Sequence, residues 1–149
     1  MAISRSVREA VAARARHCCE YCHSQEAFSP DRFQVDHIEP RGLGGADEPG
    51  NLAWTCGGCN NAKSDSISAT DPESMKPVRL FNPRIHVWED HFAWIEDFTK
   101  MRGRSEIGRA TIDRLKLNRP NLLRLRGVLR EAGSHPPIEI VSDGMKAEE

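Results

Sequence analysis

Residues 19–22 read Cys-Glu-Tyr-Cys, and residues 56–59 read Cys-Gly-Gly-Cys. Each C-x-x-C pair lets two thiolates converge on one ion, and four thiolates match the tetrahedral preference of structural Zn²⁺. The two glycines of the second pair allow the backbone to turn tightly. The sequence therefore predicts a structural zinc site that joins two distant segments of the chain, and its ligands are Cys19, Cys22, Cys56 and Cys59. Buried or redox-active thiols are the alternative.

A fifth cysteine, Cys18, precedes the first pair directly. Pairing it with Cys22 would leave three intervening residues, which departs from the C-x-x-C spacing. We therefore expect Cys18 to be a thiol at the end of a helix and not a zinc ligand.

The residues between the two pairs predict a strand, a loop and a second strand, and a helix is predicted to follow. Residues 33–38 alternate apolar and polar side chains, and Pro40 and the glycines of 42–45 then indicate a loop. Residues 52–55 form a second short apolar run, and a helix can open at Cys59.

Four polar side chains are expected on or near this hairpin, namely Asp36, His37, Asn51 and Asn60. Phosphodiester hydrolysis requires a base to activate water, a cation to offset developing charge, and a group that orients the base. Neutral His37 can accept the proton of water, and Asn51 can fix the loop that aims the imidazole. Asp36 and Asn60 offer the oxygen ligands that suit a hard cation such as Mg²⁺. Because neighbouring strand residues point to opposite faces, Asp36 and His37 share one site only if the strand ends or twists there.

These motifs together resemble the zinc-knuckle branch of the HNH endonucleases. The resemblance covers residues 19–63 and rests on Cys19-x-x-Cys22, Val35-Asp36-His37-Ile38-x-Pro40, Gly44-Gly45, Asn51-Leu52 and Cys56-x-x-Cys59-Asn60-x-x-Lys63.

The resemblance implies an α+β fold: a small ββα-metal hairpin–helix core with a four-cysteine zinc knuckle, an N-terminal helix and a C-terminal helical extension. It also implies His37 as the general base, Asn51 as the central Asn of the motif, and Asp36 with Asn60 as ligands of a catalytic Mg²⁺ or Mn²⁺ ion. Many members of the family have His at the position of Asn60, so the pattern here is H-N-N. The expected substrate is DNA, in double-stranded form, and a homodimer is one way to cut both strands.

Three parts of the chain are expected. Residues 1–65 combine the nuclease core with an N-terminal helix that starts at a capping box on Ser6 and ends near His17. Residues 66–133 form an aromatic and basic extension packed on this core, and residues 134–149 form a flexible tail.

Within the extension, the polar composition of residues 64–77 predicts a connector with little regular structure. Trp88, Phe92 and Ile95 fit one face of a short helix. Two further helices are predicted. Ser105 caps the first, which begins near Glu106, and the second covers residues 121–132.

Charge is distributed unevenly along the chain. The net charge is −1, which argues against a protein that coats nucleic acid through bulk positive charge. Residues 102–133 nevertheless carry nine arginines and lysines against three acidic residues. The predicted DNA contacts are Lys63, Arg109, Arg119 and Arg126; a solvated basic helix face is the alternative.

Composition narrows the setting and the class of function. The sequence has no run of eighteen apolar residues and does not begin like a secretory signal, so we expect a cytoplasmic location without a membrane partner. A metal-dependent endonuclease is the main hypothesis. The alternatives are a zinc-stabilised nucleic-acid-binding module without turnover and a zinc-stapled protein-interaction domain.

Overall fold

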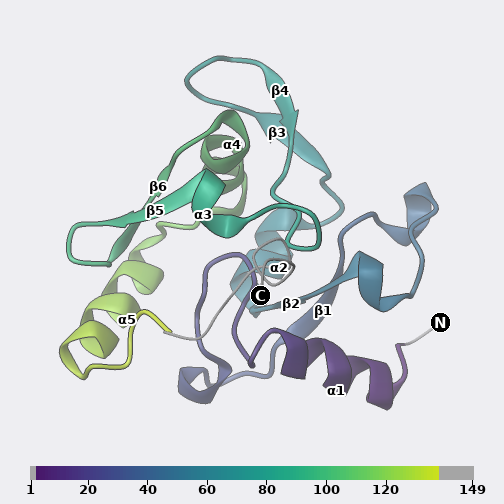
Figure 1. Cartoon of the computed structure of the whole chain (residues 1–149), viewed down its shortest axis with the longest axis horizontal. Coiled ribbons are helices and arrows are strands. Elements are labelled where there is room, and N and C mark those ends of the chain that lie inside the picture. Colours follow the sequence, from purple (N-terminus) through teal and green to yellow (C-terminus); the bar gives the residue numbers. More distant parts are fainter. Residues whose placement is uncertain (1–2, 138–149) are drawn as a thin grey trace.

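A β-hairpin lies between the two cysteine pairs, and a helix begins within the second pair. The computed structural model describes residues 3–137, and Figure 1 shows its elements. Strand β1 (Gln34–His37) pairs antiparallel with β2 (Leu52–Thr55), and His37 lies opposite Leu52. Helix α2 (Gly57–Lys63) follows directly. It starts two residues earlier than expected because Cys56 caps it, its Sγ accepting the Cys59 N–H at 3.5 Å.

Helix α1 (Arg5–Arg14) precedes this unit and contacts β2. Its N-cap is Ser4, whose Oγ accepts the Val7 N–H at 3.3 Å, so the predicted cap at Ser6 is wrong. The predicted end near His17 is also too late. Arg16 and His17 both have positive φ values, and this backbone conformation cannot continue a right-handed helix.

The predicted connector contains a second hairpin. Strand β3 (Ser68–Thr70) pairs antiparallel with β4 (Pro77–Arg79), so the expectation of little regular structure over residues 64–77 is wrong. The buried carboxylate of Asp71 accepts the N–H groups of Glu73 and Ser74. These hydrogen bonds close the turn between β3 and β4. The Ser, Asp and Pro content of this segment predicts a loop and does not reveal the two strands beside it.

The aromatic segment divides between a helical turn and a strand. Helix α3 (Trp88–His91) is followed at once by β5 (Phe92–Ile95), which pairs with β6 (Lys100–Gly103). The predicted helical face through Trp88, Phe92 and Ile95 is therefore wrong. Residues 92–95 form a strand because they pair with β6, where Trp94 lies opposite Met101. The helical spacing of apolar residues in this segment gives no information about that pairing.

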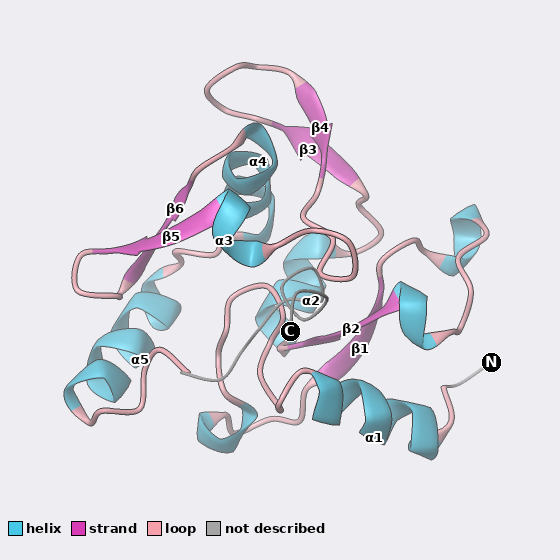
Figure 2. Cartoon of the chain, viewed as in Figure 1, coloured by secondary structure: helices cyan, strands magenta, loops and turns pink. Residues whose placement is uncertain are grey.

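The two C-terminal helices lie close to their predicted positions (Figure 2). Helix α4 (Glu106–Leu115) begins at Ser105, whose Oγ accepts the Gly108 N–H at 3.0 Å. Helix α5 (Pro120–Glu131) follows, with proline at its first position.

The predicted flexible tail begins with packed residues. His135 is buried, and its Nε2 lies 2.7 Å from the carbonyl oxygen of Phe98. The remainder of that predicted tail, from residue 138 onward, lies outside the described residues.

One hydrophobic core connects the hairpin to the extension. It contains Val11 from α1, Leu52 from β2, Phe81 and Trp88, and Leu115 from α4. None of the helices within residues 3–137 combines the length and the apolar composition that a membrane-spanning segment needs.

Candidate functional site

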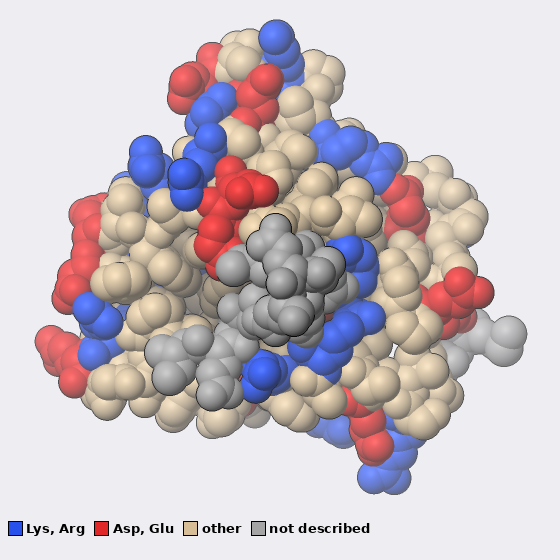
Figure 3. Space-filling view, in the orientation of Figure 1, with Lys and Arg blue, Asp and Glu red and all other residues tan. Residues whose placement is uncertain are grey.

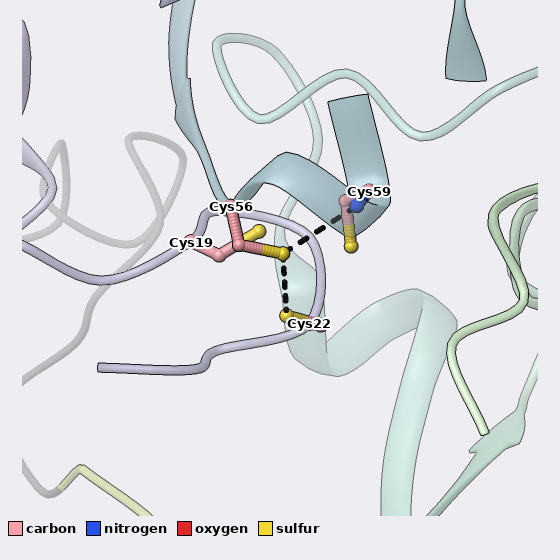
Figure 4. A group of neighbouring side chains, drawn as sticks. All are labelled: Cys19, Cys22, Cys56 and Cys59. Carbon is pink, nitrogen blue, oxygen red and sulfur yellow. Dashed lines mark hydrogen bonds between the residues drawn. The ribbon is translucent and has the colours of Figure 1, made fainter. Parts of the chain in front are cut away.

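The four paired cysteines meet in the core (Figure 4). Their Sγ atoms all lie within 4.8 Å of one another, and Cys22 Sγ is 3.7 Å from Cys56 Sγ. Four sulfurs placed tetrahedrally about 2.3 Å from one zinc ion would be separated by about 3.8 Å. The cluster therefore fits a closed structural Zn²⁺ site formed by Cys19, Cys22, Cys56 and Cys59.

Cys18 lies apart from this cluster, as its spacing predicts. Its Sγ donates to the carbonyl oxygen of Arg16 at 3.4 Å. Burial raises the pKa of the Cys18 thiol to about 11. Its sulfur is not among the four that cluster within 4.8 Å of one another.

Arg119, a predicted DNA contact, lies against the cysteine cluster. Its Nη2 is 3.5 Å from Cys56 Sγ and 3.8 Å from Cys59 Sγ, so the guanidinium can balance the negative charge of thiolates. Gly58 makes room for it, because a Cβ at this position would lie 2.5 Å from Arg119 Nη2. The extension thus contributes a cation to the outer layer of the metal site.

Asp36 belongs to a buried ionic network that links strand β1 to helix α2. Its Oδ2 accepts the Tyr21 hydroxyl at 2.8 Å, and Lys63 Nζ lies 3.2 Å from its carboxylate. Burial raises the pKa of Asp36, and the charge of Lys63 opposes this effect. Lys63 is 2% exposed, so the predicted phosphate contact at this residue is wrong in this conformation. It serves as the counter-charge of Asp36.

His37 contacts a residue that the sequence reasoning did not identify. Its Nε2 lies 2.7 Å from Asp47 Oδ1, and Arg41 donates to both oxygens of Asp47 at 2.8 and 3.0 Å. The Arg41 and His37 hydrogen bonds lower the pKa of Asp47 to about 2. The sequence offers one signal for Asp47. It is an acidic residue close after Gly44 and Gly45, in the loop that joins the two strands of the hairpin and begins beside His37.

Asn51 joins the two ends of this loop. Its Oδ1 accepts the Glu39 N–H at 2.8 Å, and its Nδ2 donates to the carbonyl oxygens of Glu39 and Ala46 at 2.9 Å. These are the loop-fixing bonds expected of this amide. Gly45 lies inside the same turn, where a Cβ would come within 1.7 Å of the Glu39 oxygen.

Asp36, His37 and Asn60 line one cleft of about 410 Å³, together with Arg41, Ser64 and Asp65. Both Asp36 and His37 lie within β1, where Asp36 is buried and His37 is half-buried. Their hydrogen bonds diverge: Asp36 bonds inward to Tyr21, and His37 contacts the loop. Asn60 donates through Nδ2 to Gln34 Oε1.

The remaining predicted DNA contacts are occupied within the fold. Arg109 pairs with the buried carboxylate of Asp71 at 3.0 and 2.8 Å. Arg126 is 2% exposed and donates to the carbonyl oxygens of Thr99 and Leu117 at 3.1 and 2.7 Å. The predicted DNA contact at Arg126 is therefore wrong in this conformation. In Figure 3, lysine and arginine side chains alternate with acidic ones on the face in view.

Comparison with known proteins identifies the segment that contains this site. Residues 19–66 match the family described as HNH endonuclease. No curated protein and no solved structure matches the chain. The matched segment contains all four clustered cysteines and the ββα unit. Residues 19–66 therefore match the HNH endonuclease family, and the four clustered cysteines fit the zinc-knuckle form of that family.

Proposed function

We propose that this chain is a metal-dependent endonuclease that hydrolyses phosphodiester bonds of double-stranded DNA, with His37 as the general base. The observation that carries the proposal is the single cleft lined by an imidazole, a carboxylate and an amide, namely His37, Asp36 and Asn60. These residues belong to the segment that matches the nuclease family.

His37 supplies the proton transfer in this proposal. Neutral imidazole takes one proton from water as the water oxygen bonds to phosphorus, and the bond from phosphorus to the leaving oxygen breaks. The leaving oxygen is then protonated by solvent. Asn51 acts through position, because its three hydrogen bonds hold the loop that contacts the imidazole.

Asp36 and Asn60 would hold the divalent cation. Each oxygen of a carboxylate has two acceptor sites, so the bonds from Tyr21 and Lys63 do not exhaust Asp36, and Asn60 uses only its nitrogen on Gln34. This oxygen donor set fits Mg²⁺ or Mn²⁺. The cation, when bound, stabilises negative charge on the phosphate and on the leaving oxygen.

The test is cleavage of supercoiled plasmid in Mg²⁺ or Mn²⁺. Loss of a general base lowers rates by roughly 10²- to 10⁴-fold, so His37→Ala should lose nearly all cleavage. His17→Ala is the matched control because His17 is an exposed histidine on another segment. The proposal is wrong if His37→Ala cuts as fast as the parent protein.

A second candidate, a zinc-stabilised DNA-binding module without turnover, is favoured by one observation. Lys63 neutralises the buried carboxylate of Asp36, and a cation would have to share that carboxylate. DNA binding with no cleavage in any divalent metal would support this candidate and contradict the endonuclease.

Substrate form and assembly belong to the same proposal. Comparing supercoiled, linear and single-stranded DNA tests the preference for double strands, and sedimentation of the protein on DNA tests for a homodimer. A cytoplasmic location is consistent with reduced cysteines, which zinc ligation requires.

A further inference from the structure

The side chains of Asp47 and His37 form a short hydrogen bond between two defined atoms. The contact joins Nε2 to Oδ1 at 2.7 Å, and the exposed fraction of the His37 side chain is 18%. Arg41 holds the same carboxylate through Nε on Oδ1 and Nη2 on Oδ2. A two-point contact of this kind fixes the plane of the carboxylate as well as its position.

The chemistry of this contact assigns the protons of the imidazole. An ionised carboxylate only accepts hydrogen bonds, so a neutral His37 must carry its proton on Nε2. The lone pair then resides on Nδ1, the nitrogen free to take a proton. When His37 becomes an imidazolium, the same carboxylate stabilises it.

We propose that Asp47 is a positioning residue of the catalytic site: it orients the His37 ring, holds the proton on Nε2 and leaves Nδ1 as the base. This inference rests on the proposed function, because it assigns a role within that reaction. Asp47 makes its effect through His37 and does not need to touch DNA.

Two features keep Asp47 in place. Arg41 pairs with it and lies on the lining of the cleft. Asn51 donates to the carbonyl oxygen of Ala46, the residue before Asp47, and so ties the backbone of the loop to the hairpin. The carboxylate is therefore held from its side chain and from its main chain.

The alternative is an ordinary ion pair at the rim, since 38% of the Asp47 side chain is exposed. Removing any acidic residue from this loop would then strengthen DNA binding and leave the chemical step unchanged. Glu48→Ala is the matched control. It removes the same charge from the neighbouring position, and Glu48 contacts the loop through its backbone carbonyl, which the substitution retains.

The experiment compares Asp47→Ala and Glu48→Ala in two measurements on the zinc-loaded protein. In the first, plasmid cleavage is measured over a range of DNA concentrations. Asp47→Ala should lower kcat by roughly 10- to 100-fold, the usual effect of losing a partner that orients a functional histidine, with a KM close to that of Glu48→Ala. Asp47→Asn keeps the shape of the side chain and one acceptor oxygen, so its kcat should fall between the parent and Asp47→Ala.

The second measurement needs no turnover. In ¹⁵N-edited NMR spectra, the His37 Nε2 proton should give a downfield signal protected from exchange, assigned by its loss in His37→Ala. That signal should persist in Glu48→Ala and be lost in Asp47→Ala. If the parent protein cuts DNA, equal kcat values for the two alanine variants would overturn the inference. A signal that survives in Asp47→Ala would overturn it whether or not the parent cuts. Because the NMR signal does not depend on cleavage, a failure of the proposed endonuclease activity is distinguishable from a failure of the Asp47 assignment.

Discussion

At the residue scale, the loop that carries Asp47 depends on a glycine at position 45. A Cβ there would lie 1.7 Å from the backbone oxygen of Glu39 and 2.9 Å from Asn51 Nδ2, so the loop can close only without a side chain. Gly45→Ala should lower the free energy of unfolding by about 1–3 kcal/mol, the typical cost of overpacking. It should also weaken the protected His37 Nε2 signal, because Asp47 moves with the loop.

Gly42→Ala is the control for this prediction. Gly42 lies in the same loop, and no atom lies within 4 Å of the position of its Cβ. Denaturant unfolding and the NMR signal are measured for both variants. If both variants lose the same stability, general loss of loop flexibility explains the effect and the close approach at Gly45 does not.

Residue types in a motif were more predictable than the contacts they make. The C-x-x-C spacing alone was enough to select Cys19 over Cys18, because ligand geometry is local. The partner of Lys63 was not predictable, because the burial of its ammonium group depends on the position of Asp36 across the hairpin. Asp47 was missed for the same reason: its contact with His37 is made by the closed loop.

At the element scale, the strongest local signals gave the most accurate boundaries. Ser105 capped α4 as predicted, and proline at the start of α5 set its first turn. The errors are in the hairpins β3–β4 and β5–β6. Their strands, of three or four residues each, are stabilised by pairing with another strand, and the sequence pattern of one strand does not contain its partner.

The ion pair that links the β3–β4 hairpin to α4 makes the free energy of unfolding depend on pH. Arg109 on α4 lowers the pKa of the Asp71 carboxyl below its ordinary value through two hydrogen bonds. Because the folded pKa is lower than the unfolded one, the stabilisation is complete above the unfolded pKa and is lost as the pH falls through the folded pKa. Asp71→Asn should therefore be less stable than the parent at neutral pH, and the difference should shrink below about pH 4.

Unfolding by denaturant at several pH values checks this prediction. Zinc thiolates are protonated at low pH in both proteins, so the difference between parent and variant is the informative quantity. Glu73→Gln is the control, because Glu73 also pairs with Arg109 but 73% of its side chain is exposed. A parent–variant difference for Asp71→Asn that stays constant into the acid range would contradict the assignment.

At the scale of the whole molecule, the basic extension acts largely on the protein itself. Arg119 contacts the cysteine cluster, Arg126 binds backbone carbonyls in the interior, and Arg109 pairs with Asp71. A count of charges along the sequence cannot distinguish these roles from DNA binding, because an arginine can also be used inside the fold, where carbonyl, carboxylate or thiolate groups accept its hydrogen bonds. The extension therefore completes the fold around the hairpin.

From this arrangement we expect the whole fold to depend on zinc. The four cysteines belong to the same core as Phe81 and Trp88 of the extension, and Arg119 spans the two parts. Ligation of structural zinc contributes on the order of 10 kcal/mol in small domains, which is comparable with the total stability of a domain this size. Chelation at neutral pH, or Cys56→Ser, should therefore unfold the hairpin and the extension together.

Tryptophans in the hairpin and in the extension allow the unfolding of each part to be measured. Trp54 lies in β2, and Trp88 and Trp94 lie in the extension, so fluorescence of variants that retain one tryptophan reports each part separately. Elemental analysis should find about one zinc ion per chain in the parent and none in Cys56→Ser. Cys18→Ala is the control and should keep the zinc ion, because Cys18 is buried but does not belong to the cluster. Trp88 and Trp94 spectra that do not change on chelation would show that the extension folds independently of the metal. Cooperative loss of all three signals is expected, because neither part retains a complete core when the cysteines separate.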